Sequence, residues 1–97
     1  MKTLRILSEA EGEIVDALDY YAIQSPQLAL RFLDELDQAI RKIHSNPHHY
    51  AIYFKQSRRK NLYKFPYAII FRIDKNEVLI QAVAHASRRP GYWASRI

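Results

Sequence analysis

The C-terminal end of the chain gathers side chains that can bind an anion or move a proton. His85 is followed closely by Arg88, Arg89, Tyr92 and the single tryptophan, Trp93. Guanidinium groups bind carboxylates and phosphates through paired hydrogen bonds, and imidazole titrates near neutral pH. The segment is therefore a candidate functional site. The alternative is structural: the two aromatic rings cover the edge of the core while the arginine pair binds acidic residues of an early helix, and for Trp93 we favour this role.

A second basic segment lies at residues 55–64, where Arg58, Arg59 and Lys64 are interspersed with aromatic residues. For a nucleic acid, such cations would neutralise phosphates while the rings stack on bases. The same composition is typical of an exposed edge strand that charge protects against unwanted pairing, and composition alone favours this second interpretation. Arg72 is different, because alternation puts it on a strand face with apolar neighbours, where an isolated charge needs an anionic partner.

The spacing of the residues supports neither a metal site nor a catalytic nucleophile. His44, His48 and His49 straddle Pro47, so no helical ligand pair forms across them, and no acidic residue lies close by. The chain has no cysteine, which excludes a disulfide, a thiolate metal site and a cysteine nucleophile. A nucleophile-elbow motif is absent as well. We therefore expect neither a metal site nor a cofactor.

Length and charge narrow the class of protein. A chain of 97 residues with 48% hydrophobic and 26% charged residues predicts a single globular domain over residues 1–97. Its net charge of +5 is uneven. Residues 1–46 hold five Lys or Arg against eight Asp or Glu, a balance of −3, whereas residues 47–97 hold ten against two, a balance of +8. The basic half favours an anionic partner, either nucleic acid or an acidic protein segment.

The expected compartment is the cytoplasm. The N-terminal basic residues are followed by too few apolar residues for a signal peptide, and an acidic run begins at Glu9. No apolar stretch approaches the length of about 18 residues that indicates a membrane-spanning helix. Secretion and membrane insertion are both disfavoured.

Start and stop signals predict two helices after a short strand at residues 2–7. Ser8 is a good N-cap for the first helix, and acidic residues follow it in the first turns, where the helix dipole favours negative charge. Ser25-Pro26 starts the second helix, and Asn46-Pro47 ends it. Because the link between the helices is so short, they are expected to form an antiparallel hairpin.

Alternating apolar residues predict three further strands, at residues 62–65, 67–73 and 78–85, with a turn at residues 74–76 between the last two. The expected fold class is α+β with the order β-α-α-β-β-β, an antiparallel sheet packed against the N-terminal helical hairpin. Apolar side chains from both helices and from the last two strands are expected in the core: Leu18, Phe32, Leu33, Leu36, Ile40, Tyr67, Ile69, Phe71, Ile80 and Ala82.

Several motifs occur together as a spaced set. Ala82-Val83-Ala84-His85 is followed by Arg88, Pro90 and Trp93 at the end of the chain. Earlier motifs are Ser8-Glu9-Ala10, Tyr20-Tyr21, Ser25-Pro26, Ala29 with Phe32-Leu33-Asp34-Glu35-Leu36, Asn46-Pro47 and Phe65-Pro66-Tyr67. This set resembles the ParE/RelE superfamily of type II toxins, the toxic halves of bacterial toxin–antitoxin operons, nearly end to end. The ending is typical of the ParE branch of plasmid-stabilising toxins, and the resemblance implies the RelE/ParE-like toxin fold.

The resemblance implies one of two activities. RelE-like members cleave messenger RNA on the ribosome, whereas characterised ParE toxins mostly inhibit DNA gyrase and so block replication. RelE-like ribonucleases commonly have an Arg directly after the Tyr of this strand, where the chain has Ala68 after Tyr67. One phosphate-stabilising cation is then missing, which favours a gyrase inhibitor without chemistry of its own. The alternative is a metal-independent endoribonuclease whose substitute catalytic set would be Arg72, His85, Arg88 and Tyr92.

The resemblance also implies a partner protein. A cognate antitoxin would be a small DNA-binding protein whose acidic C-terminal segment folds on the toxin and contacts its basic half. A degenerate toxin that only binds its antitoxin is a further alternative. The residues expected to contact gyrase or the antitoxin are Arg58, Arg59, Lys64, Arg72, His85, Arg88, Arg89, Tyr92 and Trp93.

Overall fold

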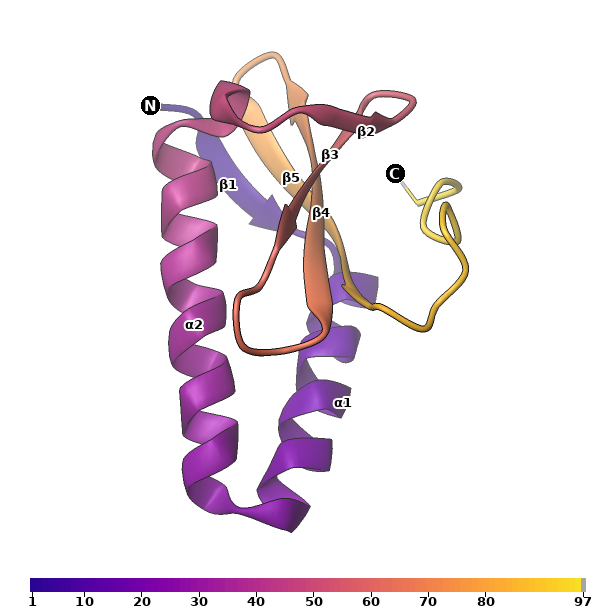
Figure 1. The fold of residues 1–97 in the computed structure, drawn as a ribbon. Helices are drawn as coiled ribbons and strands as arrows, with labels where there is room; N and C mark the ends of the chain where they lie inside the picture. The colour runs from indigo at the N-terminus through magenta and orange to yellow at the C-terminus, as the bar shows by residue number, and fades with distance from the viewer. Residues whose placement is uncertain (97) are drawn as a thin grey trace.

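The computed structural model describes residues 1–96 and confirms the α+β class. The elements are β1 (Thr3–Ile6), α1 (Ser8–Gln24), α2 (Pro26–Ser45), a 3₁₀ helix η1 (Pro47–His49), β2 (Ile52–Phe54), β3 (Ser57–Asn61), β4 (Tyr67–Asp74) and β5 (Glu77–His85). The strands form one sheet in the order β1-β5-β4-β3-β2. The two helices run antiparallel beside the sheet, and the segment after β5 turns back towards it (Figure 1). Among residues 1–96, no helix combines the length and apolar character needed to cross a membrane.

The sheet is mixed because its first strand is parallel to its neighbour. Strands β2 to β5 pair in antiparallel fashion, as expected. β1 pairs in parallel with β5, and Thr3 lies opposite Glu77. An ion pair of 3.0 Å between Arg5 Nε and the Glu77 carboxylate reinforces this exposed edge. The hydrogen bond from Arg5 holds the pKa of Glu77 below its usual value.

Both helices begin where the sequence predicts, but neither serine caps its helix with its side chain. α1 begins at Ser8, and the carbonyl of Leu7, the N-cap residue, accepts the Glu11 N–H at 2.9 Å. Ser25 is the N-cap residue of α2, yet its hydroxyl donates to Gln27 Oε1 at 3.0 Å. The predicted N-cap role of Ser8 is wrong, because the backbone of the preceding residue occupies that position.

The strand predicted at residues 62–65 is wrong, and two strands precede it instead. β3 pairs with β4 so that Arg58 lies opposite Phe71 and Asn61 opposite Ala68. Residues 62–65 form the loop after β3, and the apolar side chains at its two ends, Leu62 and Phe65, are buried. The apolar residues that suggested a strand here are Leu62 and Phe65, whose side chains the loop buries in the core.

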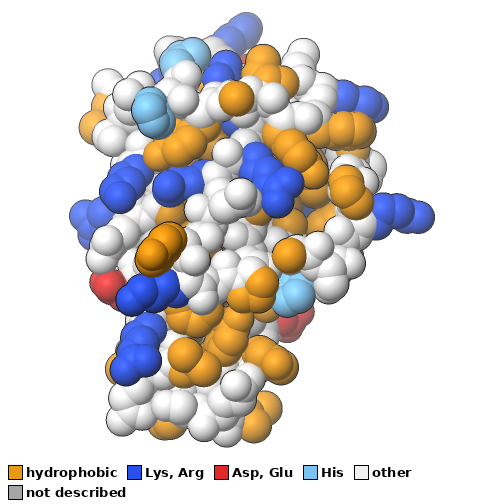
Figure 2. Space-filling view, viewed as in Figure 1, with side chains coloured by type: hydrophobic (Ala, Val, Ile, Leu, Met, Phe, Trp, Pro, Cys, Tyr) orange, Lys and Arg blue, Asp and Glu red, His pale blue; other side chains and the backbone are white. Residues whose placement is uncertain are grey.

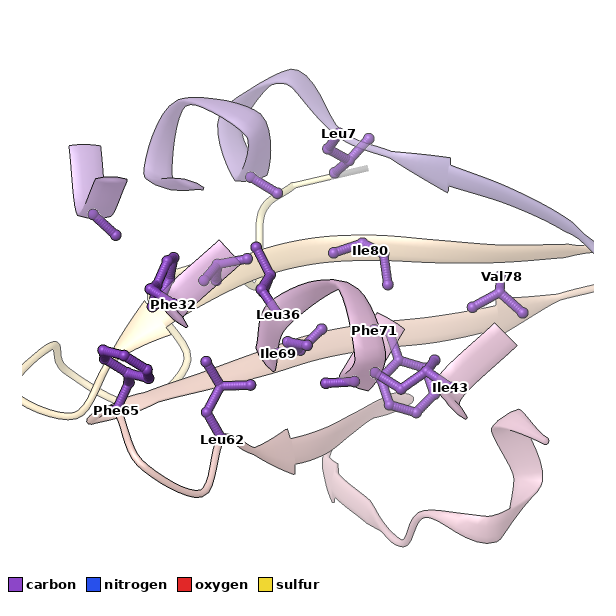
Figure 3. Close-up of a cluster of buried hydrophobic side chains, with 14 of the residues drawn as sticks. Leu7, Phe32, Leu36, Ile43, Leu62, Phe65, Ile69, Phe71, Val78 and Ile80 are labelled. Carbon is purple, nitrogen blue, oxygen red and sulfur yellow. The ribbon is translucent and has the colours of Figure 1, made fainter. Parts of the chain in front are cut away.

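The main core lies between the helical hairpin and the sheet (Figure 3). Phe32 and Leu36 of α2 face Ile69 and Phe71 of β4 in this cluster. The prediction for Leu33 is wrong, because 43% of its surface is exposed on the outside of α2. The other predicted members from the helices and from the start of β4 are partly buried against the same cluster: Leu18, Ile40 and Tyr67.

A β-bulge in β5 reverses the alternation of its side chains. Neighbouring residues of β4 pair with Ile80 and Ala82, which leaves Gln81 as the extra residue. Ile80 belongs to the core beneath the helices, whereas Ala82 belongs to a second cluster. Both residues are fully buried, as expected, but the bulge places them in different clusters on opposite faces of the sheet. The bulge gives the second half of β5 an apolar surface directed away from the main core.

Candidate functional site

The segment after β5 covers that second apolar surface. Trp93 is only 2% exposed and packs against Ala68, Ile70, Ala82 and Ala84. The structural role favoured for Trp93 is confirmed. The segment therefore forms a layer of its own, and the residues that it carries are held against the sheet.

Glu13 of α1 binds the segment after β5 and so holds it against the rest of the fold. Its carboxylate accepts the Tyr92 hydroxyl at 2.5 Å and forms an ion pair with Arg96 at 2.9 Å. It also accepts the Val83 amide at 2.9 Å. β1 pairs with β5 only as far as Ile80, so the Val83 amide lies beyond the end of β1. The Glu13 carboxylate accepts this amide in place of a strand partner. One side chain thus joins α1, β5 and the C-terminal segment.

Tyr92 lies among charged groups that fix its ring. The guanidinium of Arg88 is 3.9 Å from the ring centroid, and that of Arg96 is 5.1 Å away. Burial, together with the hydrogen bond to Glu13, raises the pKa of Tyr92 well above its usual value. Of the ion pairs among residues 1–96, the one that reaches an acidic residue of α1 comes from Arg96 and not from the pair Arg88 and Arg89. That part of the structural alternative is therefore wrong.

A cavity of about 370 Å³ lies beside Trp93, between the C-terminal segment and the sheet. We call it the Trp93 cavity. Its floor is apolar and includes Ile70, and the side chains around it carry positive charge or aromatic rings but no carboxylate. The residues of these two kinds are Arg59, His85, Arg88, Tyr53, Tyr67, Tyr92 and Trp93. The arrangement suits a ligand that carries both an anionic group and an apolar or planar group.

Stacking holds the two arginines of the Trp93 cavity. The Arg59 guanidinium lies 4.6 Å from the Tyr53 ring centroid, and its Nε donates to Asn61 Oδ1 at 2.8 Å. Tyr53 in turn stacks on Trp93 with centroids 5.9 Å apart. Within the part of the chain that the structure describes, neither Arg59 nor Arg88 forms an ion pair. Their charges are positioned but not neutralised.

His85 lines the cavity, and one of its ring nitrogens is held by a local hydrogen bond. Its Nδ1 accepts the Ser87 backbone N–H at 3.0 Å and lies 2.8 Å from the Ser87 hydroxyl. The proton of the neutral ring is then on Nε2, an assignment that follows from this hydrogen bond. The ring also packs edge-on against Tyr67 with centroids 5.0 Å apart. The acceptor nitrogen that a general base requires is therefore already engaged.

A second cavity of about 370 Å³ continues from the first one towards α1. The two share Tyr67, His85, Arg88 and Tyr92, but the second also contains Glu13 and Asp16. The charge of Glu13 is paired with Arg96, whereas Asp16 is exposed. The whole cleft is therefore cationic at one end and acidic at the other.

Four of the predicted site residues lie outside the Trp93 cavity. Arg58 donates to the Tyr50 carbonyl at 2.6 Å. Lys64 lies in the loop after β3 and lines a separate groove of about 630 Å³ beside α2. Arg72 is near the turn between β4 and β5, at the far end of the hairpin from His85. Arg89 is exposed and lines none of these cavities.

Basic side chains spread over the face of the molecule seen in Figure 2, and acidic ones are visible only near its margins. Three residues around the Trp93 cavity and the C-terminal segment were not among the predicted site residues: Glu13, Tyr53 and Arg96. Glu13 stands in an acidic run that the helix dipole already explains, so no local signal separates it from its neighbours. Its partner Arg96 is 83 residues away in the chain, and such a contact has no local sequence signature.

The fold and the Trp93 cavity define the class of protein. It is a small α+β protein with a helical hairpin on one side of a mixed sheet and a cationic, aromatic cavity on the other. The family model of the ParE toxin of type II toxin–antitoxin system, parDE, matches residues 4–90. The chain therefore belongs to the ParE toxin family, and the resemblance to the ParE branch is confirmed.

A solved structure shares the fold. It is described as a chromosomal ParDE TA system from P. aeruginosa, and it matches with a TM-score of 0.79 and 18% sequence identity. The match covers 90% of this chain and 98% of the other. None of the curated proteins matches the chain.

Proposed function

We propose that the chain is the toxin component of a type II toxin–antitoxin system, acts in the cytoplasm, and inhibits DNA gyrase and thereby replication. The observation that carries the proposal is the ParE family match over residues 4–90, since characterised ParE toxins mostly act on gyrase. A cognate antitoxin that binds the toxin would neutralise it. No metal, cofactor or covalent step is required, because the protein acts by occupying its target.

The geometry around the Trp93 cavity supports binding in preference to RNA cleavage. A metal-independent ribonuclease needs a base to take the 2′-hydroxyl proton and cations at the scissile phosphate. The acceptor nitrogen of His85 is engaged by Ser87, and the position after Tyr67 is Ala68. Arg72, a member of the alternative catalytic set, lies at the opposite end of the β4–β5 hairpin. The remaining groups can hold a partner without being arranged for proton transfer.

The proposed contact surface is the rim of the Trp93 cavity. Arg59 and Arg88 carry charges that no acidic side chain neutralises in residues 1–96. Charged groups at a rim raise the rate of association with an oppositely charged partner, and their effect weakens with salt. Both gyrase and an acidic antitoxin segment could use this surface, which would explain how one partner excludes the other.

Induced expression in growing bacteria tests this proposal. We expect cells to filament and to induce the DNA-damage response while bulk protein synthesis continues. Prompt arrest of protein synthesis with messenger RNA cleaved on ribosomes would establish the RelE-like alternative. Normal growth with abundant folded protein would establish a degenerate toxin. The phenotype of the induced cells therefore identifies the target.

A further inference from the structure

We propose that the groove beside α2 binds the phosphate backbone of duplex DNA. The groove has a volume of about 630 Å³ and lies between α2 and the chain formed by the end of β3 and the loop after it. We call it the α2 groove. Four cationic side chains line it, two from each wall: Arg31, Lys42, Lys60 and Lys64. The inference goes beyond the proposed function, which requires contact with gyrase but no contact with DNA.

The charge of the α2 groove favours a polyanion. Its lining holds four cations against two carboxylates, and among residues 1–96 none of these cations forms an ion pair. Glu35, one of the two acids, accepts the backbone N–H groups of Tyr63 and Lys64, the latter at 3.1 Å. Asp34, the other acid, accepts the Gln38 amide at 3.0 Å. Both acids are thus engaged in hydrogen bonds within the fold, and the excess positive charge attracts phosphates.

The cations extend along the groove. Arg31 and Lys42 lie eleven residues apart on α2, which corresponds to about 16 Å along the helix axis. One strand of duplex DNA carries a phosphate about every 3.4 Å of its axis, so the groove is long enough to follow several phosphates. Lys60 lies on the opposite wall, and because β3 is an inner strand, protection of a sheet edge does not explain this charge. Basic side chains gather on the left of Figure 2, over α2 and the loop after β3.

The wall opposite α2 is held in place. The two backbone N–H groups that Glu35 accepts tie the loop after β3 to α2. Leu62 and Phe65, at the two ends of this loop, are buried in the core. Because the loop is already fixed at both ends and in its middle, less conformational entropy is lost when Lys64 binds a phosphate.

The aromatic residues of the lining favour a duplex over a single strand. Proteins hold single-stranded nucleic acids by stacking successive bases on aromatic side chains. Of the two aromatic residues that line the groove, Phe65 is buried, so Tyr63 alone is available for stacking. Contacts to phosphates position a duplex but carry no sequence information. We therefore expect binding to duplex DNA that does not depend on its sequence.

Fluorescence anisotropy of a short labelled DNA duplex, titrated with the purified protein, tests this inference. We expect saturable binding with a dissociation constant of about 1 to 100 μM near physiological salt, the usual range for sequence-independent binding. The logarithm of the binding constant should fall against the logarithm of the salt concentration with a slope of about −3 to −4, as expected for about four phosphate contacts. A duplex of scrambled sequence should bind equally well.

Neighbouring residues of α2 provide a matched pair of variants. Lys42→Gln removes a charge that lines the groove, whereas Arg41→Gln removes a charge that does not. Lys42→Gln should weaken binding about fivefold and make the salt slope shallower by about 1, and Lys64→Gln, on the opposite wall, should do the same. Arg41→Gln should change binding less than about twofold, because it breaks only an exposed ion pair with Asp37. Circular dichroism would verify that each variant is folded.

Four results would overturn the inference: no binding of the duplex, equal effects of Lys42→Gln and Arg41→Gln, tighter binding of single-stranded DNA or of RNA with the same sequence, or equally tight binding of a polyglutamate peptide with the same number of charges. Gyrase inhibition measured on the same preparations separates this inference from the proposed function. A protein that inhibits gyrase but does not bind the duplex contradicts only the groove. A protein that binds the duplex but leaves gyrase active contradicts only the target.

Discussion

Glu13 and Tyr92, 79 residues apart in the chain, are joined by a hydrogen bond of 2.5 Å from the phenol to the carboxylate. The same carboxylate binds Arg96 and the amide of Val83. The position of the C-terminal segment, and with it the walls of the Trp93 cavity, therefore depends on one acidic residue of the first helix.

The variant Glu13→Gln should lower the free energy of unfolding by about 2 kcal/mol, because an amide cannot neutralise the largely buried guanidinium of Arg96. Urea denaturation measures the change. Glu11→Gln is the matched control, since Glu11 is exposed on the same helix, and it should cost less than about 0.5 kcal/mol. Equal costs for the two variants would mean that Glu13 does not hold the segment.

Tyrosine ionisation should make stability fall at alkaline pH. The raised pKa of Tyr92 means that the folded chain keeps this proton at a pH where the unfolded chain has lost it. The stabilisation is therefore complete below the usual tyrosine pKa of 10.0 and is lost as the pH rises above that value. Tyr92→Phe should reduce the slope of melting temperature against pH above about pH 10. Burial also raises the pKa of Tyr21 and Tyr67, so part of the slope should persist.

An unchanged alkaline slope in Tyr92→Phe would contradict the structure around Glu13. Tyr63→Phe is the control, because Tyr63 is 89% exposed. It should leave the slope as in the wild type.

Two leucines of α2 provide a test of the helix orientation. Leu36 is 2% exposed and Leu33 is 43% exposed. Leu36→Ala should cost about 2 to 5 kcal/mol, because it removes buried methyl groups and leaves a cavity, whereas Leu33→Ala should cost less than about 1 kcal/mol. Chemical denaturation measures both. A larger cost for Leu33→Ala would show that the hairpin presents its other face to the sheet.

Much of the fold could be predicted from local patterns. The helical hairpin follows from the stop and start signals around Ser25-Pro26, and the β4–β5 hairpin follows from its alternating residues and its turn. β3 could not be predicted, because its sequence Ser-Arg-Arg-Lys-Asn has little of the apolar alternation that marks a strand. Pairing with the buried strand β4 imposes the extended conformation, so tertiary context decides. The bulge at Gln81 has no sequence marker such as glycine.

The candidate site was predicted only in part for a related reason. Residue types and order identify Arg88, Tyr92 and Trp93 as a candidate cluster. The side chain that holds them, Glu13, comes from the opposite end of the chain, and the contact forms only when β5 passes beside α1. Arg58 and Arg59 are equivalent in sequence, yet strand alternation turns one towards Tyr50 and the other towards Tyr53.

Variants of the two arginines after β5 should differ in toxicity. Arg88→Ala should reduce killing by the induced protein, because Arg88 lines the Trp93 cavity, whereas Arg89→Ala should kill like the wild type. Both variants should keep their stability within about 1 kcal/mol of the wild type, as surface changes usually do. Colony counts after induction and thermal denaturation measure the two properties. If the two variants are equally toxic, the contact surface lies elsewhere than at this cavity.

Supercoiling of relaxed plasmid by purified DNA gyrase, with and without the purified protein, tests the central claim most directly. We predict that the wild-type protein blocks supercoiling in a dose-dependent manner and that Arg88→Ala requires a higher dose. Full supercoiling at every dose of folded protein, together with cleavage of messenger RNA on ribosomes by the same preparation, would contradict a gyrase inhibitor.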